Sequence, residues 1–326
     1  MVGIKNKKMY TKLDQEIINI LCCPLCKGSL EMVGDKFFCK DCANQYPLHD
    51  VQQEKEKEGV FDFRIYRPDY CITAGFAKWF DVQSDYEEGY FERDIKPDNL
   101  EEYQREINFV KEIYDKEFDI KGRVLDVGGG EGKLRHFIKK NEVSLYISVD
   151  PIINGFENFR LRKNLLKAYP RLAEPCNFLS CYSEHLPFKA NIFDCVHMKS
   201  VLDHFQDPYI AIKEVYRVLK PKGILIISST TYGGKSFSKI EDRDIFWRRL
   251  ISDAVYKFRI YGFKSLIEAI IKKLFNKKGW ATTHIINWRY EDLIDLLRKT
   301  NFSIQKEYWQ KPPFDMIVWI EAKKLT

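Results

Sequence analysis

The sequence predicts an α/β protein with a parallel sheet, preceded by a small cysteine-rich module. From residue 119 onward, short β-forming runs alternate with segments of helical apolar periodicity, as in a sheet whose strands are joined by crossover helices. Ahead of these runs, the pairs Cys23-Pro-Leu-Cys26 and Cys39-Lys-Asp-Cys42 are separated by twelve residues. The alternation of strands and helices predicts the fold class, and the two cysteine pairs predict a separate metal-binding unit.

Size and composition are those of a globular protein without a membrane span. The chain has 326 residues, of which 45% are hydrophobic and 31% charged, and no apolar run approaches the roughly 20 residues that cross a bilayer. Residues 1–10 contain lysines but no apolar core follows them, so we expect no secretory signal and a cytoplasmic location. Nine cysteines, an odd number, favour reduced thiols over a disulfide framework.

The module begins with an amphipathic lead-in over residues 13–21 and continues into the two C-x-x-C pairs. Each pair turns sharply enough to aim two thiolates at one ion, and Gly34-Asp35 suits the tip of a hairpin between the pairs. Four thiolates predict a tetrahedral structural zinc, because a catalytic zinc keeps one position open. Cys22 is an alternative to Cys23 as a ligand. The predicted metal ligands are Cys23, Cys26, Cys39 and Cys42.

A glycine-rich turn follows the first predicted strand of the sheet. Val124-Leu-Asp-Val127 runs into Gly128, Gly130 and Gly132, and helical spacing resumes at residues 134–138. Glycines in such a strand-to-helix turn let the backbone approach a nucleotide closely. Lys133 occupies the position where the dinucleotide fingerprint needs a small residue, which disfavours a hydride-transfer cofactor. A second strand, residues 144–149, ends at Asp150, where a carboxylate suits ribose hydroxyls.

These segments resemble the class I S-adenosylmethionine-dependent methyltransferases. The Asp-x-Gly-x-Gly-x-Gly run is similar to their first motif, and Glu214-Val-Tyr-Arg-Val-Leu-Lys-Pro-Lys-Gly223 resembles the type 11 subgroup over about residues 119–230. The resemblance implies a Rossmann-like sheet of seven strands, the last antiparallel. In Tyr182-Ser-Glu-His-Leu-Pro-Phe188, a tyrosine replaces the adenine-contacting acid of the family. The implied contacts to S-adenosylmethionine are Asp126, Gly128, Gly130, Gly132, Asp150, Tyr182, Ser183 and Lys199.

The cysteine module resembles the zinc ribbon of the Trm112 type, which occurs alone as a methyltransferase activator and fused ahead of methyltransferase domains. The matching residues are Cys23-Pro-Leu-Cys-Lys-Gly-Ser-Leu30, Phe38-Cys39, Cys42 and Tyr46-Pro-Leu-His-Asp50. In that module the Tyr-Pro segment usually continues into a run of Asp-Gly and an apolar residue. Here the run, Gly59-Val-Phe-Asp-Phe63, comes only after the charged residues 51–58, which we interpret as a surface insertion.

We therefore expect five parts in the chain: a zinc ribbon (residues 1–63), an aromatic-rich linker with a cofactor-covering helix (64–118), the cofactor-binding core (119–232), a basic helical insertion (233–280) and a C-terminal helix with a β-hairpin (281–326). The insertion holds twelve Lys or Arg against five Asp or Glu, a net +7 compared with +6 for the whole chain. It is interpreted either as a solvated helical lid or as a surface for an anionic acceptor or a membrane face.

Methyl transfer to a hydroxyl needs a base, for which imidazole is suited because it titrates near neutrality. His204, beside Asp203 after the fourth strand, is the first candidate and His284 the second; a packing or capping role is the alternative for His204.

The leading function is S-adenosylmethionine-dependent methylation of a small molecule or glycan, and the acceptor can be anionic or lipid-linked. Residues 233–280 would then contact the inner face of the membrane peripherally. The alternatives are an RNA methyltransferase with the zinc ribbon as substrate arm, for which no stacking platform is recognisable, and a non-catalytic cofactor-binding relative.

Overall fold

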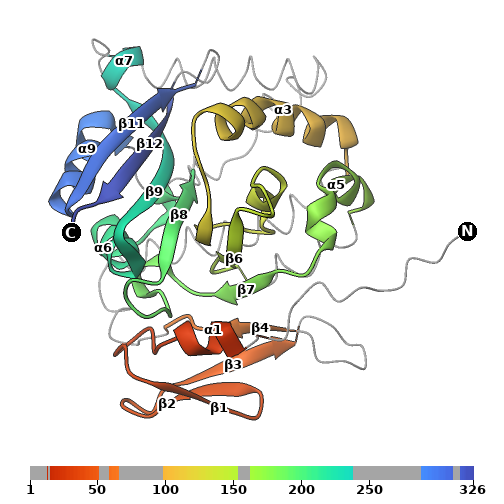
Figure 1. Ribbon diagram of the computed structural model, residues 1–326, viewed down its shortest axis with the longest axis vertical. Coiled ribbons are helices and arrows are strands. Elements are labelled where there is room, and N and C mark those ends of the chain that lie inside the picture. The colour runs from red at the N-terminus through yellow and green to blue at the C-terminus, as the bar shows by residue number, and fades with distance from the viewer. Residues whose placement is uncertain are drawn as a thin grey trace, which may run out of the picture.

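A computed structural model describes residue 13 and residues 15–50, 59–65, 98–152, 162–237, 288–310 and 316–326 (Figure 1). Within these residues, no helix is both long and apolar enough to cross a membrane. Several predictions fall outside the described residues: the charged segment 51–58, most of the aromatic linker, the helices of the basic insertion, His284 and the turn around residues 312–313.

The cysteine module, residues 15–50 and 59–65, is a small antiparallel sheet with one short helix. It contains α1 (Gln15–Ile20), β1 (Leu30–Val33), β2 (Lys36–Cys39), β3 (Gln45–Asp50) and β4 (Gly59–Asp62). The predicted hairpin is confirmed, since β1 and β2 pair antiparallel and Val33 faces Lys36 across the tip. Gly34 at that tip has a φ of +66°, which glycine adopts without strain.

The α/β domain is built on a mixed sheet whose strands follow the order β7-β6-β5-β8-β9-β12-β11. The first five pair in parallel, β12 runs antiparallel to β9, and β11 runs antiparallel to β12. The predicted seven strands are confirmed; a two-residue strand, β10 (Trp288–Arg289), also pairs with β9. Their bounds are β5 (Gly122–Val127), β6 (Val143–Val149), β7 (Asn177–Ser180), β8 (Phe193–Lys199), β9 (Leu219–Tyr232), β11 (Phe302–Trp309) and β12 (Ile317–Lys324).

The sheet of the cysteine module is continuous with that of the α/β domain, which the sequence did not predict. Strand β4 pairs in parallel with β7, and Phe61 lies opposite Leu179 (Figure 1). This pairing covers the edge of β7, whose backbone groups would otherwise lack partners. Phe61 and Phe63 also pack on Phe37 of β2, with ring centroids 4.7 and 5.6 Å apart. One hydrophobic cluster therefore runs from the module into the α/β domain.

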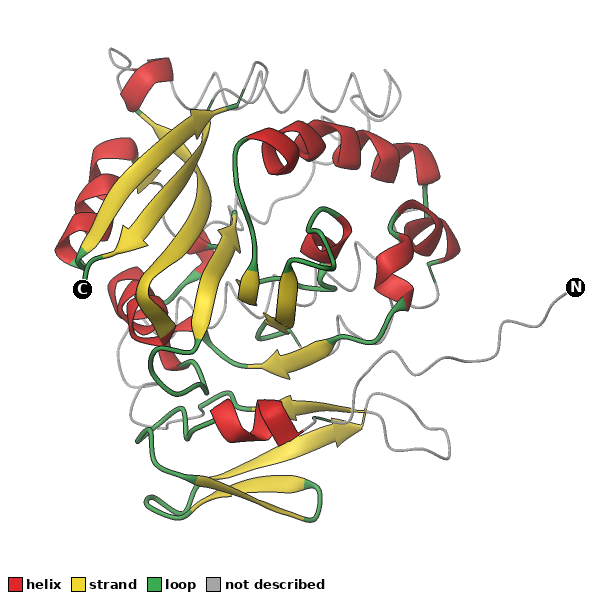
Figure 2. Cartoon of the chain, viewed as in Figure 1, coloured by secondary structure: helices red, strands yellow, loops and turns green. Residues whose placement is uncertain are grey.

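Helices cover both faces of the sheet, as the apolar character of its strands requires (Figure 2). Alternate residues of β5 divide between two clusters: Val124 packs with α3, whereas Leu125 packs in the cluster of α6 and α9. Asn99 caps α3 by accepting hydrogen bonds from the amides of residues 101 and 102. The helices are α3 (Leu100–Lys116), α5 (Lys163–Ala168), α6 (Pro208–Val218), α7 (Gly234–Phe237) and α9 (Tyr290–Lys299).

The crossover after the glycine turn differs from the expected helix. Only one 3₁₀ turn, η2 (Lys133–His136), forms before the chain enters β6. The glycine turn uses five of the fifteen residues between Val127 and Val143, which leaves ten for a helix and the return to β6. The helical periodicity of residues 134–138 is instead used to bury Leu134 and Ile138 against α3.

Candidate functional site

The glycine turn lies where β5 ends, at the carboxyl edge of the parallel strands. Gly128 has a φ of +67° and donates its amide hydrogen to the Val149 carbonyl, 2.8 Å away. A β-carbon at Gly128 would stand 2.4 Å from a methyl carbon of Val201, so only glycine fits. The turn thus brings the ends of β5 and β6 and the loop after β8 together.

Gly130 is the point at which the turn is open. It has a φ of +48°, and a β-carbon built there would meet no heavy atom of the described residues within 4 Å, its chain neighbours apart. Its amide donates to Asp150 Oδ2 at 3.2 Å, while its carbonyl accepts from Ser148 Oγ at 3.2 Å. The open backbone and the carboxylate predicted to bind ribose are therefore adjacent, as a nucleoside site at this edge requires.

Asp126 lies beneath the turn rather than in the open space. Its side chain is buried; Oδ2 accepts from the Tyr146 hydroxyl, and Oδ1 lies 2.7 Å from His197 Nδ1. His197 Nε2 is in turn 3.0 Å from the hydroxyl of Tyr114 in α3. Burial raises the pKa of both tyrosines well above the usual range. This chain of polar groups favours a supporting role for Asp126, and a direct cofactor contact stays a prediction.

Sequence reasoning missed the histidine in this network. His197 is the one imidazole inside the otherwise apolar stretch Cys195–Met198 of β8, and it is 2% exposed. A polar residue at a buried strand position needs hydrogen-bonding partners, which was the available signal. Nothing in the sequence identified Tyr114 and Asp126 as those partners, because α3 and β5 are distant from β8 along the chain.

The segment predicted to contact adenine follows β7. Tyr182 precedes the short 3₁₀ turn η5 (Ser183–His185), and Ser183 is buried. Glu184 fixes this segment, because its Oε1 accepts from the amides of Gln206 and Asp207 at 2.8 and 3.0 Å. Burial raises the pKa of Glu184, although these hydrogen bonds act to lower it. The carboxylate of Glu184 therefore holds this segment next to residues 206 and 207. The adenine contacts of Tyr182 and Ser183 stay predictions.

The cysteine module contacts residues beside two segments of the candidate site, namely the segment predicted to contact adenine and the chain directly after Asp150. Lys27 Nζ lies 2.6 Å from Glu214 Oε2 and 3.3 Å from the Leu186 carbonyl, at the end of the segment predicted to contact adenine. Arg64 NH1 donates to the carbonyl of Pro151, directly after Asp150, at 3.1 Å. Desolvation and the neighbouring Arg217 lower the pKa of Lys27, although Glu214 opposes them. These bonds connect the module to both sides of the candidate site.

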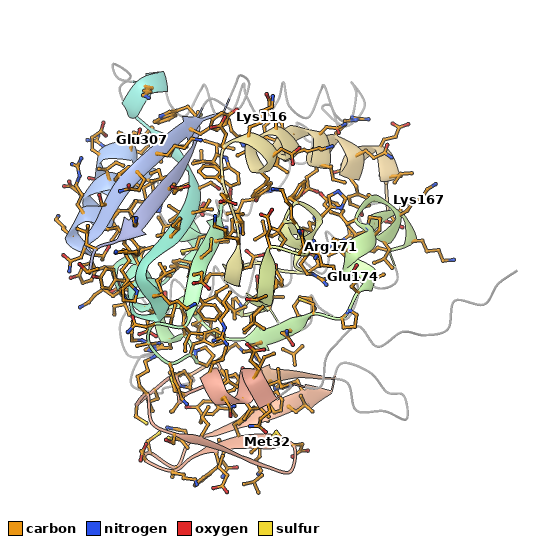
Figure 3. The ribbon with its side chains drawn as sticks, viewed as in Figure 1. Met32, Lys116, Lys167, Arg171, Glu174 and Glu307 are labelled. Carbon is orange, nitrogen blue, oxygen red and sulfur yellow. The ribbon has the colours of Figure 1, made fainter. Side chains whose placement is uncertain are left out.

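The predicted base lies in the 3₁₀ turn η6 (Leu202–His204), immediately after β8. Asp203 Oδ1 is 3.9 Å from His204 Nε2, so the two side chains are neighbours without a short hydrogen bond between these atoms. Both are largely buried. Lys199, the last residue of β8, lies on the same edge of the sheet. Figure 3 shows the side chains of the described residues in the region of α3 and the sheet.

The four thiols predicted to share an ion lie together. The sulfur atoms of Cys23, Cys26, Cys39 and Cys42 are all within 4.8 Å of one another, and Cys22 is not part of the group. Hydrogen bonds support two of them: the Tyr46 hydroxyl is 3.0 Å from Cys23 Sγ, and Asn44 Nδ2 donates to Cys42 Sγ at 3.1 Å. Four sulfur donors at this spacing fit tetrahedral zinc, with no position left open for catalysis.

The residues at the strand edge likewise fit S-adenosylmethionine. A nucleoside cofactor needs a backbone that it can approach and a carboxylate for its ribose, and Gly130 and Asp150 supply both. Fold and site thus define an α/β protein with a nucleoside-binding edge and an attached four-cysteine metal module. Residues 125–227 match the family model described as methyltransferase domain, and residues 14–50 match that of Trm112p-like protein. The chain therefore carries a methyltransferase domain behind a Trm112p-like module.

Relatives match parts of the chain. Cycloartenol-C-24-methyltransferase of Arabidopsis thaliana is 34% identical over 103 residues, which are 30% of this chain and 28% of that protein. Ubiquinone/menaquinone biosynthesis C-methyltransferase UbiE of Haemophilus ducreyi is 45% identical over 51 residues, 16% of this chain and 20% of that protein. The chain thus spans less than a third of these relatives. A solved complex of the Haloferax volcanii Trm112 methyltransferase activator with a methyltransferase aligns at 12% identity and a TM-score of 0.45, covering 76% of this chain and 97% of that one.

Proposed function

We propose that the protein transfers a methyl group from S-adenosylmethionine to a small-molecule or glycan acceptor. The observation that carries this proposal is the open glycine turn, in which the Gly130 amide is hydrogen bonded to Asp150 and a β-carbon built at Gly130 would have no heavy atom of the described residues, its chain neighbours apart, within 4 Å. The match of residues 125–227 to a methyltransferase domain supports it. In this proposal Asp126, Gly128, Gly130, Gly132, Asp150, Tyr182, Ser183 and Lys199 form the cofactor site.

The chain's own part in the reaction is chiefly positioning. The bound cofactor supplies an electrophilic methyl group on a sulfonium, and in-line transfer requires donor and acceptor to be held in contact. Gly128 and Gly130 shape the donor side, and Asp150 orients it. For a hydroxyl acceptor, His204 next to Asp203 takes the proton, with His284 as the second candidate. A packing role is the alternative for His204, and loss of turnover with cofactor binding intact in His204→Gln would separate the two.

The acceptor class rests on two further observations. Both relatives are named for methyl transfer at carbon in cycloartenol and in ubiquinone/menaquinone biosynthesis, which are small molecules. The segment 233–280 has a net charge of +7, which suits an anionic or lipid-linked acceptor and peripheral contact with the inner face of the membrane from a cytoplasmic location. We keep the division at residues 63, 118, 232 and 280 as the proposed domain organisation.

The experiment is transfer of labelled methyl from S-adenosylmethionine into a fractionated cell extract, with and without ribonuclease. Label in ribonuclease-resistant lipid, glycan or small-molecule fractions is the expected result. Ribonuclease-sensitive label would replace the proposal with an RNA methyltransferase whose Trm112p-like module, residues 14–50, serves as the substrate arm. Cofactor binding without transfer to any fraction would identify a non-catalytic relative.

A further inference from the structure

Strand β9 continues past the end of its neighbour β8. The last residue of β8, Lys199, lies opposite Ser228 of β9, and β9 runs on for four more residues, to Tyr232. At about 3.3 Å per residue, this extension of β9 reaches roughly 13 Å beyond the end of β8. Open α/β sheets bind ligands outside the carboxyl ends of their parallel strands. The extension therefore lies beside the region in which a ligand is expected.

The two-residue strand β10 occupies the place in line with β8. Its Trp288 pairs in parallel with Thr231 of the extension. The opposite side of β9 is taken by the chain that leads into β12, because the Thr231 amide donates to the Met316 carbonyl at 2.8 Å. Strand β10 consequently lies on the side of β9 that β8 occupies further down. Thr231 and Trp288 thus stand at the carboxyl edge of the sheet, beyond the end of β8.

Thr231 and Trp288 are buried polar side chains that lack hydrogen-bond partners. Thr231 is 0% exposed and Trp288 9%, and neither Thr231 Oγ1 nor Trp288 Nε1 has a partner among the residues that the structure describes. Since paired residues of adjacent strands point to the same face, the two side chains are neighbours on one face of the sheet. Burial of a polar group is costly unless the group is hydrogen bonded. A ligand that supplied the missing hydrogen bonds would remove this cost.

The chemistry of the two groups fits an uncharged oxygen atom. The indole N–H can only donate a hydrogen bond, whereas the threonine hydroxyl can donate and accept. The oxygen of a hydroxyl or carbonyl group has two lone pairs and can accept from both. The surroundings are apolar, since Trp288 belongs to the same hydrophobic cluster as Leu202, Phe205 and Leu293. A phosphate or carboxylate in such surroundings would need a charged partner, which this pair does not supply.

We propose that Thr231 and Trp288 bind a hydroxyl or carbonyl oxygen of the methyl acceptor. The assignment rests on the proposed function and narrows its acceptor class to molecules whose bound part is apolar and carries such an oxygen. Both polar atoms are shielded from water, so neighbouring side chains must move aside when the acceptor enters. The hydrogen bonds gained on binding then offset the cost of burying the two groups in the free protein.

The test is transfer of labelled methyl from S-adenosylmethionine into the organic-solvent-soluble fraction of a cell extract, with the amount of that fraction varied. Thr231→Val removes the hydroxyl and keeps the shape of the side chain, and Trp288→Phe removes the indole N–H. Either variant should raise the amount of fraction needed for half-maximal transfer roughly 2- to 10-fold, the range of one hydrogen bond. Affinity for S-adenosylhomocysteine, measured by calorimetry, should not change. The urea midpoint of Thr231→Val should stay the same or rise, because a buried hydroxyl without a partner is removed.

Thr300→Val is the matched control, because Thr300 is also buried but its hydroxyl is hydrogen bonded to the Leu296 carbonyl at 2.8 Å. This variant should lower the urea midpoint and leave transfer by the folded protein unchanged. Half-maximal transfer at the wild-type amount of fraction in Thr231→Val and Trp288→Phe, or a parallel loss of affinity for S-adenosylhomocysteine, would overturn the assignment. Label confined to water-soluble fractions, or absent from every fraction, would overturn it as well. If the wild-type chain did not bind S-adenosylhomocysteine, the proposed function itself would fail.

Discussion

Substitution of Gly130 by alanine should lower both the free energy of unfolding and the affinity for the cofactor, and the two effects can be measured separately. With a φ of +48°, an alanine at this position adopts a left-handed conformation, which costs about 1–2 kcal/mol of unfolding free energy. Among the residues that the structure describes, only its chain neighbours lie within 4 Å of the new methyl group, so no clash with them adds to that cost. In the proposed complex the methyl group stands in the space of the cofactor. Overpacking of about 1–3 kcal/mol corresponds to a loss of affinity of roughly 5- to 150-fold.

Gly34 offers the matched control. It lies at the hairpin tip of the cysteine module with a φ of +66°, and a β-carbon there also meets no heavy atom of the described part of the chain within 4 Å, its neighbours apart. Urea unfolding should show similar destabilisation of Gly34→Ala and Gly130→Ala, whereas titration with S-adenosylhomocysteine should show weakened binding only for Gly130→Ala. Unchanged affinity of Gly130→Ala, or equal weakening by both variants, would refute the placement of the cofactor against the glycine turn.

Three further predictions concern the supports of the site. Tyr114→Phe leaves His197 Nε2 without its partner and should lower the unfolding free energy by about 1–2 kcal/mol in urea; a change below about 0.3 kcal/mol would contradict the buried network. Removal of zinc by a chelator should weaken S-adenosylhomocysteine binding, because Lys27 follows directly on a metal ligand and supports the Leu186 carbonyl; unaltered affinity of the metal-free chain would contradict this coupling. The lowered pKa of Glu106 means that its contribution to stability is present above the ordinary value of 4.5 and is lost as the pH falls through the lower folded value. The difference in unfolding free energy between wild type and Glu106→Gln should therefore shrink below about pH 4.5, and a difference that grew there would reverse the assigned sign.

Local patterns were enough to predict the elements that depend on short stretches of chain. The spacing of the two C-x-x-C pairs predicted four thiols in one group, since each pair needs only a local turn to align its sulfur atoms. Gly128 and Gly130 predicted the turn after β5, and the acid at the end of the next strand placed Asp150 beside it. Apolar runs with turn residues between them predicted the strands of the sheet, which the structure confirms.

Features that depend on contacts between distant segments were not predictable in this way. The parallel pairing of β4 with β7 joins residues more than a hundred positions apart, and four-residue strands carry no signal for their partners. The same holds for the contact of Lys27 with Glu214 and for the network of Asp126, His197 and Tyr114. Each is set by how complete elements pack, and the cysteine module consequently supports the nucleoside side of the site.

A crystal structure of the full chain with S-adenosylhomocysteine would test the central claim most directly. The account predicts the ribose hydroxyls on Asp150 and the sulfur beside the Gly128–Gly130 backbone. Ligand bound elsewhere on the chain, or a glycine turn that stays free of ligand at saturating concentration, would contradict it.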